Sequence, residues 1–188
     1  MITGETRVGL ARQACRCARW PIFCIALLAA VHTAAVDFFL EPGAFLAETF
    51  AGTVPEPDKL WVKGPIKEQI HAILGAGLGS LRIKYWARDG RTAWILEAIG
   101  RDRPITAGFV IEAGRVVRVA ILIYRESRGW EVRYPFFTDQ FFGARLIEDD
   151  ALDRNIDGIT GATLSVRAIT GLSKVALLLH REARKIAE

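Results

Sequence analysis

The longest regular pattern of apolar positions lies near the C-terminus. Between Thr163 and Ile186 there is no proline, and apolar residues recur there at spacings of three and four. They are Val166, Ile169, Leu172, Val175, Ala176 and Leu179. At 3.6 residues per turn these positions share one side of a helix. The pattern therefore predicts a long C-terminal helix with one buried face.

The middle of the chain shows strand-like alternation in place of helical spacing. Two pairs of apolar stretches are separated by short turn signals, Asp89-Gly90 in the first pair and Ala113-Gly114 in the second. The stretches are Leu81–Trp86 with Thr92–Ile99, and Thr106–Glu112 with Arg115–Tyr124. Such pairs predict β-hairpins. The last stretch is rich in β-branched residues, so we expect it to be the central strand of an antiparallel sheet.

Helical patterns flank these strands. Ile66–Leu74 reads as a short amphipathic helix ended by the glycines at 75, 77 and 79. That Gly-x-Gly-x-Gly run follows a helix and precedes a strand, the reverse of a dinucleotide-binding loop, so it indicates a helix stop. Phe136–Gly143 predicts another helix begun by Thr138-Asp139, with Phe141 and Phe142 in the core. Together the elements predict an α+β fold with four to six antiparallel strands, curved and packed with helices.

An uncharged run from Trp20 to Val36 stands apart near the N-terminus and ends at Asp37. It is preceded by Arg7, Arg12, Arg16 and Arg19. Its 17 residues reach the lower limit for a membrane-spanning helix and slightly exceed a signal-peptide core. The apolar residues 38–40 favour a retained anchor, whereas Thr33-Ala34-Ala35 would suit cleavage. We favour the anchor, and in either case we expect the arginines in the cytoplasm and the rest exported.

This arrangement predicts the domain organisation and explains the charge. Residues 1–40 form the anchor or signal segment, residues 41–64 a linker rich in Pro, Gly and Glu, and residues 65–188 the folded domain. Of the net charge of +4, the first 20 residues carry +3, so the remainder is nearly neutral and no nucleic-acid partner is expected. All three cysteines precede residue 40, which is compatible with an oxidising compartment for the domain.

A polar turn runs directly into the predicted C-terminal helix. Its sequence is Asp157-Gly158-Ile159-Thr160-Gly161-Ala162-Thr163. We expect Thr160 to be the helix N-cap, because its hydroxyl can accept a backbone N–H of the first turn. A helix N-terminus reached through small residues suits an anion, and Arg167 lies one turn on, where it could neutralise a phosphate. Most such turns are only caps, so the residues alone leave a cap and an anion site both open.

The spacing Asp157-x-x-Thr160-Gly161-Ala162-Thr163 resembles the acceptor motif of the FMN-binding domain family, which includes the flavin-carrying subunits of sodium-pumping NADH:quinone oxidoreductase and Rnf-type complexes. The resemblance covers roughly residues 65–185. It implies that a flavin transferase joins the phosphate of FMN to the hydroxyl of Thr163. The other motif residues would then form the context that the transferase recognises.

A second segment also resembles this family. The family carries a Glu-Thr-Pro-Gly type loop around the flavin ring, and Glu126-Ser127-Arg128-Gly129 stands in its place, with Arg128 where the family has proline. The resemblance implies flavin contacts from these four residues. Without it, the segment reads equally well as a surface loop. Thr138 has two readings, as a helix cap or as a further flavin contact.

The remaining polar residues indicate no other chemistry. The three histidines are scattered, and the acidic residues near position 150 lack metal-binding spacing, so we expect neither a hydrolytic triad nor a metal site. The resemblance implies an exported, membrane-tethered electron carrier with covalent FMN and membrane or periplasmic redox partners. The alternatives are a flavin-free anchored scaffold that docks a partner, and a reductase for a soluble substrate. The reductase would need a substrate pocket that the sequence does not reveal.

Overall fold

The computed structural model describes residues 37–148 and 150–187. The predicted anchor or signal segment and its cysteines lie outside these residues, apart from the last few positions before residue 41. Among the residues that the structure describes, none of the helices has both the length and the apolar character that crossing a membrane requires.

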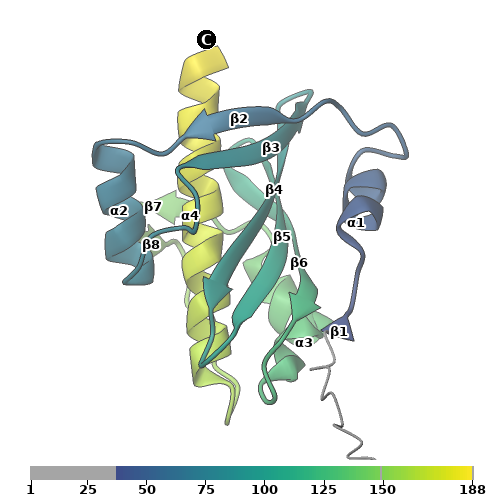
Figure 1. Ribbon diagram of the computed structural model, residues 1–188, viewed down its shortest axis with the longest axis vertical. Helices are drawn as coiled ribbons and strands as arrows, with labels where there is room; N and C mark the ends of the chain where they lie inside the picture. Colours follow the sequence, from purple (N-terminus) through teal and green to yellow (C-terminus); the bar gives the residue numbers. More distant parts are fainter. Residues whose placement is uncertain (1–36, 149, 188) are drawn as a thin grey trace, which may run out of the picture. The chain divides into compact units, whose positions relative to one another are not determined.

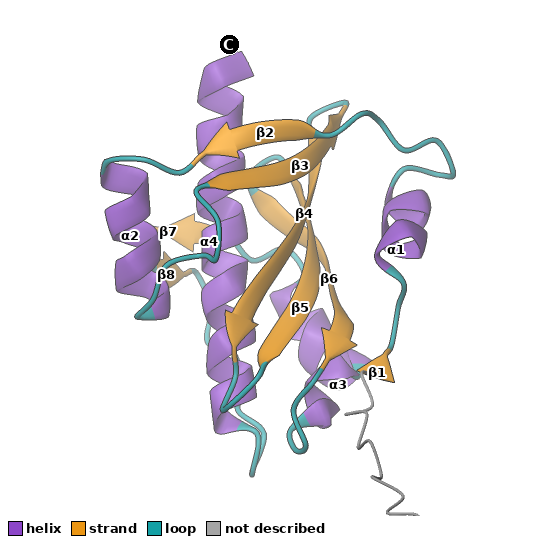
Figure 2. Ribbon diagram, in the orientation of Figure 1, coloured by secondary structure: helices purple, strands orange, loops and turns teal. Residues whose placement is uncertain are grey.

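A six-stranded antiparallel sheet forms the centre of the described domain (Figures 1 and 2). Its order is β1-β6-β5-β4-β3-β2. The strands are β1 (Asp37–Phe38), β2 (Asp58–Trp61), β3 (Arg82–Arg88), β4 (Arg91–Ile99), β5 (Pro104–Glu112) and β6 (Arg115–Tyr124). The predicted α+β class and the four long strands are confirmed.

Both predicted hairpin turns are present. Asp89 and Gly90 have φ values of 50° and 78°, and Ala113 and Gly114 have 50° and 71°. Two successive residues with positive φ make the tight turn that matches the twist of the flanking strands. The prediction that β6 is the central strand is wrong, because its outer neighbour is the two-residue β1. Strand β5 is flanked by long strands on both sides and is buried at seven consecutive residues.

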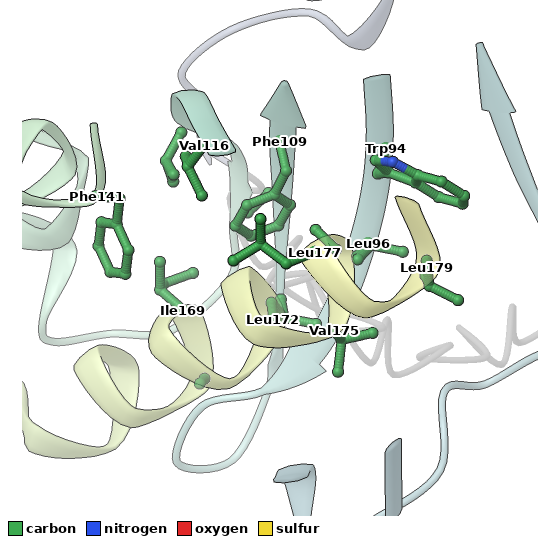
Figure 3. Close-up of a cluster of buried hydrophobic side chains, with 14 of the residues drawn as sticks. Trp94, Leu96, Phe109, Val116, Phe141, Ile169, Leu172, Val175, Leu177 and Leu179 are labelled. Atoms are coloured by element: carbon green, nitrogen blue, oxygen red, sulfur yellow. The ribbon is translucent and has the colours of Figure 1, made fainter. Parts of the chain in front are cut away.

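Helix α4 (Thr163–Ala187) covers one face of the sheet, as its apolar stripe predicts. Its side chains meet the inward-facing residues of β4, β5 and β6, and Ile169, Leu172 and Val175 are fully buried. Figure 3 shows this stripe of α4 among Trp94, Leu96 and Phe109 of the sheet. Burial of this continuous apolar surface is the main stabilising contribution to the domain. Helix α2 (Pro65–Leu74) packs beside α4 and ends at Gly75, as predicted.

Helix α1 (Pro42–Thr49) lies against the opposite face of the sheet (Figure 1). Phe45 is fully buried there, together with Ala93, Val110 and Leu122 from three strands. The ring of Phe45 rests on Gly108, where a side chain would collide with it. Residues 41–64 were expected to be a linker, yet they contain α1 and β2. The prolines and glycines of this segment favour a linker. The segment also contains a short apolar cluster around Phe45 and Leu46, which is buried against the sheet.

Short elements connect β6 to α4. They are the 3-10 helix η1 (Trp130–Arg133), helix α3 (Pro135–Thr138), the 3-10 helix η2 (Asp139–Phe141) and the small hairpin of β7 (Leu146–Ile147) and β8 (Ala151–Leu152). Phe141 is buried as predicted, but Phe142 is 67% exposed and does not belong to the core. The helical segment starts earlier than predicted, with α3 at Pro135, whose fixed φ suits a first turn. A second helical element, η2, does begin at Thr138-Asp139, with Thr138 as its N-cap residue.

A chain of buried polar groups crosses the interface between α4 and the sheet. The indole N–H of Trp94 donates to the hydroxyl of Thr92 over 2.8 Å, and that hydroxyl lies 2.8 Å from Nδ1 of His180. The hydroxyl accepts from Trp94 and either donates to Nδ1 or accepts from it, according to the tautomer of the ring. Burial, with a further contribution from the charge of Arg184, lowers the pKa of His180 to about 4.

The contact between α1 and the sheet gives a first prediction. Gly108→Ala should lower the free energy of unfolding by about 1–3 kcal/mol, because the added methyl group would lie 2.6–2.8 Å from ring atoms of Phe45. Urea unfolding followed by circular dichroism measures this difference. Gly77→Ala is the matched control, since a Cβ there meets no atom within 4 Å. Equal stability of the two variants would show that Phe45 does not hold this position.

The buried histidine gives a second prediction. The unfolded chain binds a proton at His180 below pH 6.5, whereas the folded chain resists protonation down to about pH 4. Stability should therefore be highest above pH 6.5 and fall as the pH is lowered towards 4. Urea unfolding across this range measures the slope. His180→Gln should flatten it, while replacing the exposed His71 by Gln should preserve it. A slope that persists in His180→Gln would contradict the assignment.

Candidate functional site

The polar turn of the predicted acceptor motif leads directly into α4. The N–H of Ala162 donates to the carbonyl of Ile159 over 3.0 Å, and Gly161 takes the positive φ of 82° that this turn requires. The carbonyl of Ala162 then accepts from Val166 over 2.9 Å, as the first helical hydrogen bond. Ala162 thus holds the N-cap position that we expected for Thr160, because the turn closes two residues later than predicted.

The side chains of this turn divide into a buried and an exposed set. Ala162 and Ser165 are buried, with 3% and 4% of their surface exposed. Thr163, Leu164 and Arg167 are exposed on the first turns of the helix. The hydroxyl of Thr163 is therefore open to solvent at the positive end of a 25-residue helix. Its neighbours Asp157, Thr160 and Gly161 are exposed as well, so an enzyme could reach every motif residue except Ala162.

The loop from Tyr124 to Gly129 packs against the buried side of this helix turn. The hydroxyl of Tyr124 lies 2.9 Å from Oγ of Ser165 and donates to the carbonyl of Arg128 over 2.5 Å. Burial raises the pKa of Tyr124, which keeps this donor protonated. A Cβ at Gly129 would lie 2.8 Å from Oγ of Ser165 and 3.3 Å from Cβ of Ala162. The two segments that resemble the FMN-binding family are thus in direct contact.

Within this loop, the carboxylate of Glu126 is already hydrogen-bonded to the backbone of the protein. Its Oε1 accepts the backbone N–H groups of Arg101, Asp102 and Arg103 at 2.6, 2.7 and 2.9 Å. Burial acts to raise the pKa of Glu126, but the three N–H groups outweigh burial and hold the pKa below its ordinary value. Glu126 therefore ties the turn between β4 and β5 to the loop. Ser127 and the side chain of Arg128 are exposed.

A cavity of about 420 Å³ opens beside the first turns of α4. Its walls come from α4, the end of β4, the turn held by Glu126, and the glycine-rich segment after α2. The lining residues of α4 are Leu164, Arg167 and Ala168, which lie one, four and five positions after Thr163. Glu97 also lines it, and its carboxylate accepts hydrogen bonds from Arg125 and Thr106 at 2.8 Å. The cavity is thus mostly apolar with one cation from α4.

No local pattern in the sequence predicts that the glycine-rich segment after α2 forms a wall of the cavity. Gly77 and Gly79 reach the cavity because α2 packs closely on α4, where Gly171 faces Leu74 and a Cβ would lie 2.8 Å from Cδ2 of that leucine. Tyr124 and Ser165 were also missed, since each reads as an ordinary core position. They form a hydrogen-bonded pair only because β6 and α4, which are distant in the sequence, bring them together.

Thr138 lies away from this cavity. It is buried at the end of α3, where its hydroxyl donates to the carbonyl of Tyr134 over 3.4 Å, and it borders a separate hollow beside β6. Thr138 occupies the N-cap position of η2, but its side chain makes no capping hydrogen bond there and instead donates back along α3. The link from this region to the motif comes from Gln140, whose side-chain oxygen accepts the N–H of Asp157 over 2.7 Å.

Comparison with protein families gives a match for this part of the chain. Residues 100–178 match the family model of the FMN-binding domain. This segment, which is less than half of the chain, is similar to FMN-binding domains. No curated protein and no solved structure matches the chain.

The match covers the loop and the acceptor motif of the site, but not the cavity walls formed by β4 and by the glycine-rich segment after α2. It begins at Gly100, in the turn that Glu126 holds, and ends within α4. The loop at Glu126–Gly129 and the motif at Asp157–Thr163 both lie inside it. Strands β1 to β4 and helices α1 and α2 precede the matched segment in the chain.

The role of Glu126 gives a third prediction. Glu126→Ala should accelerate hydrogen exchange at the amides of Arg101, Asp102 and Arg103 by roughly tenfold, because each loses a charged acceptor. Exchange followed by NMR resolves these amides individually. Glu131→Ala removes a carboxylate nearby and should leave them unchanged. Similar exchange in both variants would mean that Glu126 does not hold the turn.

Proposed function

We propose that this protein is an exported, membrane-tethered electron carrier with one FMN joined through its phosphate to Thr163. The observation that carries the proposal is the placement of this hydroxyl. Thr163 is exposed on the first turn of α4, inside the segment that is similar to FMN-binding domains, and ends a complete Asp-x-x-Thr-Gly-Ala-Thr sequence. An enzyme that modifies Thr163 needs access to the motif, and Asp157, Thr160, Gly161 and Thr163 are all exposed.

The surroundings of Thr163 suit a phosphate. The first turn of a helix presents N–H groups without helical partners and the positive end of the helix dipole, and both favour an anion. Arg167 lies one turn further along and adds a full positive charge. A phosphoester at Thr163 would be held by these groups, which supports Arg167 as a phosphate-binding residue.

The neighbouring cavity suits the flavin ring. Its volume of about 420 Å³ lies within the range of small-molecule sites, and its apolar lining suits a flat heterocycle. The cavity lies beside the attachment residue, because Leu164, Arg167 and Ala168, which follow Thr163 in α4, form part of its wall. FMN supplies the redox chemistry by accepting and passing one or two electrons. The protein would orient the ring, exclude water from one side of it and set the charge around it.

The attachment needs a separate enzyme. In this step the oxygen of Thr163 replaces a leaving group on the phosphorus of an activated flavin phosphate, and the hydroxyl proton is released. The chain shows no nucleotide-handling motif for this reaction, so a flavin transferase would perform it. A covalent bond is useful outside the cytoplasm, because a cofactor lost there could not be replaced from the cell's pool.

The membrane tether rests on the N-terminal sequence. The arginine cluster and the uncharged run of residues 20–36 support a single span with the flavin domain on the periplasmic side of the cytoplasmic membrane. Redox partner proteins would then be membrane-bound or periplasmic. We therefore place this protein with the flavin-carrying subunits that its motif resembles.

The attachment residue gives a fourth prediction. The protein made with a co-expressed flavin transferase should show a fluorescent flavin band in a denaturing gel, and Thr163→Ala should lose all of it, because only that hydroxyl forms the bond. Thr53→Ala is the matched control, since it removes another exposed threonine hydroxyl. Mass spectrometry of the band should show one added FMN.

The same gel separates the proposal from its alternative. A band that survives in Thr163→Ala would place the attachment at another residue. The lack of a band in the unmodified sequence, with an active transferase present, would return the Asp157–Thr163 turn to a helix terminus. A flavin-free anchored scaffold would then be the better description.

A further inference from the structure

A group of aromatic side chains lies exposed at the end of the domain where the described chain begins. We call it the aromatic end and define it as Phe39, Trp130, Arg133, Tyr134 and Phe136. Trp130 is 41% exposed, Tyr134 is 37% exposed and Phe136 is 61% exposed. Large aromatic residues gathered on one surface exceed what an ordinary soluble surface shows and indicate a binding surface.

One guanidinium group organises these rings. The charged carbon of Arg133 lies 4.4 Å from the ring centre of Phe39 and 4.9 Å from those of Trp130 and Tyr134. Trp130 meets Tyr134 edge to face at 5.7 Å, and Tyr134 lies 6.2 Å from Phe136. The aromatic end is therefore an ordered surface with a cation at its centre. Its chemistry suits an anionic group surrounded by apolar matter.

The path of the chain indicates which partner offers an anionic group in apolar surroundings. Strand β1 pairs Asp37 with Tyr124 and Phe38 with Ile123, which places Phe39 against the ring of Tyr124 at 6.1 Å. The residue before Asp37 is Val36, the last of the uncharged run. The chain thus passes from the proposed membrane anchor into the aromatic end within three residues.

We propose that the aromatic end docks on the phospholipid surface of the membrane that holds the anchor. Tryptophan and tyrosine favour the boundary between headgroups and acyl chains, and an arginine among them can pair with a headgroup phosphate. The short connection keeps the surface at a high effective concentration near the lipid, so weak contacts suffice. This proposal rests on the membrane tether of the proposed function.

Docking in this way orients the flavin site. The aromatic end follows directly on Gly129, which packs on the first turn of α4, and Tyr124 joins the two through Ser165. Figure 1 shows β1, α3 and the N-terminal end of α4 at the same end of the domain. Thr163 would consequently lie near the membrane surface, and the C-terminal end of α4 away from it.

The test uses tryptophan fluorescence of the full chain. The protein is made without transferase, so that no flavin absorbs its emission, and is reconstituted in vesicles of equimolar phosphatidylcholine and phosphatidylglycerol. Vesicles with acyl chains brominated near the headgroup quench tryptophans at that depth. Trp130→Phe should lose a quenchable component, whereas Trp61→Phe, which removes a tryptophan 55% exposed on β2, should keep it. Trp20 contributes equally in both variants.

Each outcome is decisive. Loss of quenchable emission in Trp130→Phe alone supports docking, and a reduction in Phe136→Ser, which retains Trp130, supports it independently. Protein that floats with the vesicles while Trp130→Phe and Trp61→Phe retain equal quenchable emission overturns the docking and leaves the tether standing. Protein that does not float with the vesicles overturns both. None of these outcomes affects the attachment of FMN, which the fluorescent gel band measures.

Discussion

The contact between Tyr124 and Ser165 is the interaction on which the site depends. Tyr124 closes β6, and Ser165 lies in the first turn of α4, more than forty residues later. Their hydroxyl groups meet beneath Gly129, and the absence of a side chain there lets the loop approach the helix closely. Because the contact is buried, separating it would leave polar groups without partners, which is costly. It therefore fixes the loop and the acceptor turn in one arrangement.

Much of the fold follows from local patterns. The 3.6-residue period of α4, the two turns at Asp89-Gly90 and Ala113-Gly114, and the glycine that ends α2 each act within a few residues, so the sequence predicts them well. The order of strands does not follow in this way. The β-branched residues of β6 indicate burial, but burial comes equally from helices above and below a strand. The position of β6 depends on β1, at the end of the predicted anchor segment, and on α1, in the predicted linker.

The candidate site also has a part that the sequence predicts and a part that it does not. The motif at Thr163 is contiguous, and its place at the start of a helix can be inferred from the sequence. The cavity beside it cannot, because Gly77, Glu97 and Arg167 meet only through the packing of α2 and β4 on α4. Glu126 is instructive, since its residue type suits a ligand contact, yet its carboxylate is used by three backbone N–H groups. The chemistry of a side chain does not reveal which hydrogen-bond partner it has in the folded structure.

The length of α4 imposes a direction on any electron transfer. At about 1.5 Å per residue, its 25 residues make a rod about 37 Å long. Thr163 begins this rod, so a cofactor attached there is remote from every surface at the C-terminal end. If the protein carries electrons on a flavin at Thr163, as proposed, a donor and an acceptor would both have to approach the end of the domain where α4 begins, either side by side or in turn.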